Sequence, residues 1–101
     1  MIDSFEMSVE NRNVYLKHVA SMLRSKYFVN LSGLAKAAGI LPQNLNDFVN
    51  GKEKFGVKRL NKLELFLIDL YERILEDEVP QIPSEFNIFV ETLVENEVVE
   101  I

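Results

Sequence analysis

The sequence predicts an all-α protein. Apolar residues recur at spacings of three and four along most of the 101 residues, which is the pattern of amphipathic helices. Candidate caps and turn residues separate these periodic stretches. The hydrophobic content of 48% is enough for a core, and together with a net charge of −5 it is not that of a disordered chain.

The first predicted helix covers about residues 9–27. Ser8 precedes it, and a serine hydroxyl can accept a free N–H group of the first turn. The charged residues lie mostly off its apolar stripe. The stripe consists of Leu16, Val19, Ala20, Leu23 and Tyr27, widened by Tyr15 and Met22.

Two short helices are predicted next, separated by a tight turn. Asn30 opens the first, which ends near Ala38, and Gly39 follows it. Glycine adopts the left-handed backbone that stops a helix without strain. The second runs from about Pro42 to Val49, because proline suits a first helical turn, and the pair Asn50-Gly51 predicts a turn after it.

A long helix is predicted from about Val57 to Leu75. It is apolar on more than one side, so it needs cover from the C-terminal segment or from a second copy of the chain. Residues 76–83 interrupt the pattern with three acids and two prolines. Its main stripe consists of Leu60, Leu63, Leu67, Leu70, Tyr71 and Ile74. The side chains outside this stripe, which are candidates for self-association, are Leu65, Phe66 and Ile68.

A last helix is expected after Ser84, which can cap it. Intrachain packing and self-association are both open uses for its apolar stripe. Val98, Val99 and Ile101 are expected to form a short strand or a docked tail. The apolar stripe of this last helix consists of Phe86, Phe89, Val90, Leu93 and Val94.

The charges are segregated along the chain. Residues 11–62 hold ten basic and two acidic residues, whereas residues 63–101 hold eleven acidic residues and one basic residue. Such asymmetry suggests nucleic-acid contact by the basic half, although the net charge alone argues against a nucleic-acid partner. A solvated surface with clustered signs is the alternative interpretation.

The two short helices have the spacing of a helix-turn-helix. Such a pair crosses at a steep angle, so it needs a small residue where the helices touch, a glycine at the turn and apolar residues facing inward. The residues at these constrained positions are Leu34, Ala35, Ala38, Gly39, Ile40, Leu45 and Phe48.

This pattern resembles the lambda-repressor/Cro-like, or XRE, family of helix-turn-helix proteins. The resemblance covers about residues 10–75 and implies a bundle of four to five helices, here with an additional C-terminal helix. It implies a DNA-binding domain over residues 1–78, with residues 79–101 as an acidic extension that is docked or dimerising. It further implies a transcriptional regulator, of a phage or mobile-element type, that binds operator DNA as a homodimer.

In that family the second helix of the pair lies in the major groove with its first residues near the base edges. The candidate base contacts carried over are Gln43, Asn44, Asn46 and Asp47. The candidate backbone contacts are Lys36, Asn50, Lys52, Lys54, Lys58 and Arg59. An ordinary capping or solvated role is the alternative for each of them.

The chain departs from the family at two positions. Leu31 stands where relatives often have glutamine, and Pro42 stands where a side chain frequently reads a base; both remove a polar contact. An alternative function is therefore a protein-interaction module on a helix-turn-helix scaffold, such as an antirepressor or an inhibitor of a host nucleic-acid-binding protein. Its partner would bind the acidic C-terminal part.

The composition argues against other classes. There is no cysteine and a single histidine, His18, so we expect no catalytic residue, no metal site, no cofactor and no enzyme activity. The N-terminus lacks the features of a signal peptide, and the longest apolar run is too short to span a bilayer. A cytoplasmic protein without a membrane partner is expected.

Overall fold

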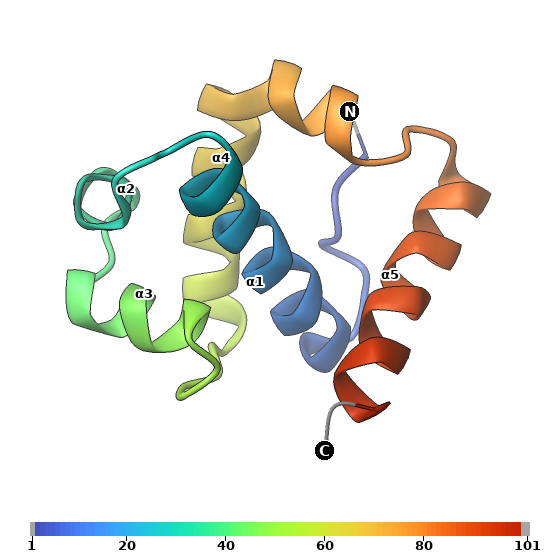
Figure 1. The fold of residues 1–101 in the computed structure, drawn as a ribbon, viewed down its shortest axis with the longest axis horizontal. Helices are drawn as coiled ribbons and strands as arrows, with labels where there is room; N and C mark the ends of the chain where they lie inside the picture. The colour runs from blue at the N-terminus through green and yellow to red at the C-terminus, as the bar shows by residue number, and fades with distance from the viewer. Residues whose placement is uncertain (1, 100–101) are drawn as a thin grey trace.

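Five helices make up the computed structural model, which describes the backbone of residues 2–99 and the side chains of residues 2–97 (Figure 1). The all-α prediction is confirmed for this part of the chain. None of its helices combines the length and the apolarity needed to cross a membrane. The helices are α1 (Val9–Lys26), α2 (Leu31–Ala38), α3 (Pro42–Val49), α4 (Val57–Glu78) and α5 (Pro83–Val99).

The ends of the first two helices are fixed by the residues that the sequence indicates. Ser8 Oγ accepts the Asn11 N–H at 3.2 Å, and Asn30 Oδ1 accepts the Gly33 N–H at 3.1 Å. Gly39 has a φ of 78° and ends α2 in the left-handed region. Each of these bonds satisfies a group that the helix itself leaves unpaired.

The fourth helix is longer than predicted. It continues to Glu78, with a kink at Tyr71 (φ −115°, ψ 24°), so the acidic run is its last turn. The added turn lies between two buried residues, Leu75 at the end of the predicted helix and Val79 directly after Glu78. Glu78 is held there by the Lys26 ammonium and, at 2.5 Å, by the Tyr27 hydroxyl.

The fifth helix begins two residues earlier than predicted. Its first residue is Pro83 rather than a residue after Ser84, and the Phe86 N–H donates to the Ile82 carbonyl at 2.8 Å. Proline fits this place because the first N–H groups of a helix have no intrahelical acceptor. The expected strand or tail is wrong for residues 98–99, which are helical, while Ile101 lies outside the described residues.

α1 lies at the centre and contacts α3, α4 and α5 (Figure 1). On one side Tyr15 meets the ring of Phe86 edge to face, with centroids 5.2 Å apart. On the other side α1 packs with α3 and α4, where Phe48 stacks on Phe55 at 4.2 Å. The stripe of α5 thus has an intrachain partner in α1.

A buried polar cluster joins the N-terminal segment to α1 and α4. Arg12 and Glu64 are each 2% exposed, and Arg12 Nη2 lies 3.1 Å from Glu64 Oε1. The Ser4 N–H and hydroxyl donate to the same carboxylate at 2.6 and 2.5 Å. Arg12 is therefore not a surface charge, although it belongs to the basic segment of the sequence.

Candidate nucleic-acid interface

The packing of α2 against α3 follows the predicted set of constrained positions. Ala35 and Leu45 are fully buried where the two helices meet, and Leu34, Ile40 and Phe48 are at most 6% exposed. Ala38 is half-buried. The Ile40 N–H donates to the Ala35 carbonyl at 2.9 Å, which fixes the turn. Because the apolar residues of α3 face inward, its polar residues are left facing outward.

The outward face of α3 carries all four predicted base contacts. Gln43 and Asn46 are exposed, and Asn44 and Asp47 are half-buried. Gln43 Nε2 donates to Asp47 Oδ1 at 3.1 Å, one helical turn away. This bond orients the Gln43 amide, and it leaves the second amide hydrogen and the carbonyl oxygen unused by Asp47.

A shallow hollow of about 220 Å³ lies between the first turns of α2 and α3. Ser32 lines it from α2, and Gln43 and Asn46 line it from α3. The first N–H groups of α2 have no intrahelical acceptor and carry partial positive charge. A Cβ added at Gly33 would meet no atom within 4 Å, so the backbone of this turn is open to close approach.

The loop between α3 and α4 carries two of the predicted backbone contacts, Lys52 and Lys54, both exposed. Asn13 of α1 clamps this loop, because its Nδ2 donates to the Phe55 carbonyl at 2.9 Å and its Oδ1 accepts the Phe55 N–H at 2.7 Å. The side chain of Asn13 is thus a positioning group for both lysines. Sequence reasoning missed it, since 42 residues separate the partners.

The other predicted backbone contacts lie on α2, at the end of α3 and at the start of α4. Lys36 and Lys58 are exposed, and neither they nor the two loop lysines form an ion pair with the described residues. Arg59 differs, because it lies 2.7 Å from Glu53 and above the Phe55 ring. Its charge is therefore partly compensated.

Asn50 ends α3 and is exposed, as a backbone contact requires. Arg24 of α1 donates to its Oδ1 at 3.5 Å, which adds a cation to this edge. A second additional cation is Lys62, whose Nζ lies 3.5 Å from the Gly39 carbonyl at the turn. Both residues are basic in the sequence, but only the fold shows that they adjoin the helix-turn-helix.

The acidic residues gather elsewhere. α5 lies on the far side of α1 from α2 and α3 (Figure 1). It has an ion pair with α1 between Lys17 and Glu97. The exposed carboxylates of α4 and α5 include Asp69, Glu72, Glu76, Asp77, Glu85, Glu91 and Glu95.

His18 has a packing environment. It is half-buried and meets the ring of Phe89 at 5.7 Å between centroids. Burial lowers the pKa of His18 below its ordinary value, and the Glu78 charge opposes that effect. In the part of the chain that the structure describes, no three His, Asp or Glu side chains gather as they would around a metal ion.

The chain matches no protein-family model, no curated protein and no solved structure. The assignment of a function therefore rests on the chain's own residues. The relevant arrangement is an outward-facing amide face on α3 with cations on the adjoining elements.

Proposed function

We propose that the chain is a sequence-specific regulator that binds double-stranded DNA with α3 in the major groove. The observation that carries the proposal is the exposed polar face of α3, flanked by Lys36, Lys52, Lys54 and Lys58. Amides supply base readout, and cations beside them supply the contacts to phosphates that position a protein on the duplex. The all-helical fold with this pair of helices is consistent with the family that the sequence resembles.

Gln43 and Asn46 are the proposed readers of adenine. A bidentate contact to adenine uses one amide N–H toward N7 and the amide oxygen toward the N6 amino group. Gln43 retains both groups after donating its other N–H to Asp47. Asp47 thus acts on Gln43 as a positioning residue, or accepts directly from a cytosine amino group, and Asn44 lies beside them.

Lys36, the two loop lysines and Lys58 are the proposed phosphate contacts. The first N–H groups of α2 that Asn30 does not cap add a further site for a phosphate oxygen. Gly33 supports this role, because no side chain stands between that backbone and an approaching ligand.

A homodimer is part of the proposal, since two-fold symmetry lets two recognition helices read successive turns of the duplex. Of the residues expected for self-association, Leu65 is 59% exposed, whereas Phe66 and Ile68 are half-buried. Leu70 belongs to the predicted main stripe of this helix but is also 59% exposed, so it is a further candidate on α4.

A protein-interaction module is the second candidate function. Leu41 favours it, because this residue is 68% exposed at the N-cap of α3 and places an apolar side chain beside the base-reading face. A module of this kind would use the scaffold to bind a protein.

Selection of bound sequences from random duplex DNA, at two salt concentrations, tests the first proposal. We expect an enriched sequence, and we expect Gln43→Ala to relax preference at one position by about 1–3 kcal/mol. Lys52→Gln should weaken binding to all sequences and reduce the salt slope by about one unit.

Arg73→Gln is the matched control, because it removes one exposed positive charge from the acidic half of α4. Its salt slope should equal that of the unchanged protein. Absence of binding at low salt would overturn the DNA-binding proposal and leave the protein-interaction module. Equal losses of preference from Gln43→Ala and Lys52→Gln would contradict the assigned roles.

A further inference from the structure

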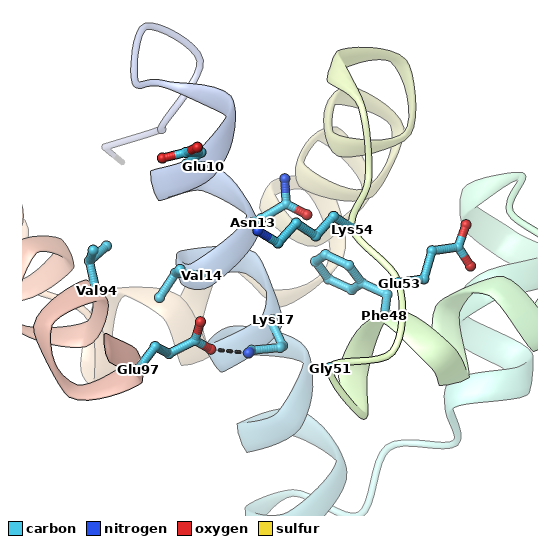
Figure 2. A pocket seen from close by; sticks show the side chains of 10 residues that line it. All are labelled: Glu10, Asn13, Val14, Lys17, Phe48, Gly51, Glu53, Lys54, Val94 and Glu97. Carbon is cyan, nitrogen blue, oxygen red and sulfur yellow. Dashed lines mark ion pairs between the residues drawn. The ribbon is translucent and has the colours of Figure 1, made fainter. Parts of the chain in front are cut away.

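A cleft of about 340 Å³ lies outside the base-reading face, where α1, α5 and the α3–α4 loop meet (Figure 2). Asn13, Val14 and Lys17 line it from α1, Lys54 from the loop, and Val94 from α5. Its volume falls at the lower end of the range of small-molecule sites, roughly 300–1,000 Å³.

One part of the cleft's lining is apolar, and the rest is polar or charged. Val14 and Val94 are half-buried and come from the two facing helices. Phe48 lines the cleft from α3, but its ring is stacked on Phe55 at 4.2 Å and is held in the core. The apolar part of a ligand therefore has a fixed surface to pack on.

The charges at the cleft are unevenly compensated. Lys17 is paired with Glu97, and the Glu53 carboxylate is paired with Arg59 at 2.7 Å (Figure 2 shows the first pair). Glu10 has no ion pair among the described residues either, but it stands in the first turn of α1, where the helix N-terminus stabilises its charge. Lys54 is the cation of the cleft without an ion pair among the described residues.

Figure 2 shows the Lys54 side chain reaching from the loop toward α1, alongside Asn13. The Asn13 amide is uncharged, so it does not neutralise Lys54, and its Oδ1 accepts the Phe55 N–H. An ammonium group beside apolar side chains matches a ligand with an anionic head and an apolar body.

We propose that this cleft binds a small organic carboxylate, with its carboxylate on Lys54 and its apolar body between Val14 and Val94. Binding would engage the charge of Lys54, a phosphate contact of the proposed interface. The ligand would therefore lower the affinity for DNA, a consequence that rests on the proposed function, whereas the site itself does not.

Titration of the full chain with 3-phenylpropanoate, without DNA, tests the site. Methyl NMR signals of Val14 and Val94 should shift, with a dissociation constant on the order of 1 mM for a ligand of this size. The uncharged 3-phenylpropanamide, of the same shape, should bind about tenfold more weakly because it lacks the charge-assisted bond.

Lys54→Gln should weaken binding of 3-phenylpropanoate by about tenfold. Lys52→Gln is the matched control, because Lys52 is exposed on the same loop but does not line the cleft. Its dissociation constant for the carboxylate should be unchanged. Three outcomes would overturn the proposal, whatever the outcome with DNA. They are equal affinity for the acid and the amide, equal losses of affinity in the two lysine variants, and NMR shifts confined to methyl groups other than those of Val14 and Val94.

Discussion

The α2–α3 pair and α5 flank α1 on opposite sides, and they are held there by different means. The pair depends on short-range features, a left-handed glycine at the turn and a fully buried alanine at the crossing point. α5 depends on long-range burial, with Phe86 and Val90 each 1% exposed. The pair can therefore vary its exposed side chains without altering its geometry, whereas the position of α5 is determined by its buried ones.

The largest expected effect is on the α5 side. Phe86→Ala should lower the free energy of unfolding by about 3–5 kcal/mol, because it leaves a cavity beside Tyr15. Ile88→Ala is the control on the same helix; Ile88 is 62% exposed, so its change should stay within about 0.5 kcal/mol. Chemical denaturation measures both. Similar small losses would show that α5 is not held by its buried stripe.

A smaller effect is expected on the side of the pair. Gly39→Ala should destabilise by about 1–2 kcal/mol, because an L-residue is strained at a φ of 78°. The added Cβ meets no atom within 4 Å, so the loss reports the backbone alone. Gly33→Ala, with equally open space, should instead stabilise by up to about 1 kcal/mol through helix propensity. Thermal unfolding of the two variants compares them directly, and shifts of the same sign would contradict this account.

The smallest effect concerns pH and the junction of α1 with α5. The folded pKa of His18 lies below its ordinary value of 6.5, so below that pH the unfolded chain binds more protons. The stability that neutral His18 contributes is full above pH 6.5 and decreases as the pH falls through this window. His18→Gln should lose less stability between pH 7 and pH 5 than the unchanged protein. Parallel pH profiles from denaturant titrations would refute a role for its burial.

The two sides also differ in how far the sequence predicts them. Asn30, Gly39 and Pro42 act on their immediate neighbours, so the bounds of α2 and α3 follow from local chemistry. The extra turn of α4 lies instead between Leu75 and Val79, which are both buried in the core. No local pattern shows where a helix meets a distant partner.

In the candidate site, too, some features follow from the local sequence and others only from packing between distant residues. The exposure of Gln43 and Asn46 follows from helical spacing once the inward face of α3 is known. The clamp between Asn13 and Phe55 joins residues 42 apart, and the buried pair of Arg12 with Glu64 joins residues 52 apart. Asparagine and arginine are ordinary surface residues by composition, so only packing reveals that these two are internal.

Exposed cations lie on the α2–α3 side of α1 and exposed carboxylates on the α5 side, so the molecule has an electric dipole. Any polyanion in solution therefore meets an anisotropic field, which turns the α2–α3 side toward it and the α5 side away before contact. Such preorientation raises the fraction of productive encounters, and salt weakens it by shortening the range of the field. If the proposed DNA binding holds, the exposed carboxylates of α5 would influence the kinetics of an encounter on the opposite side of the molecule.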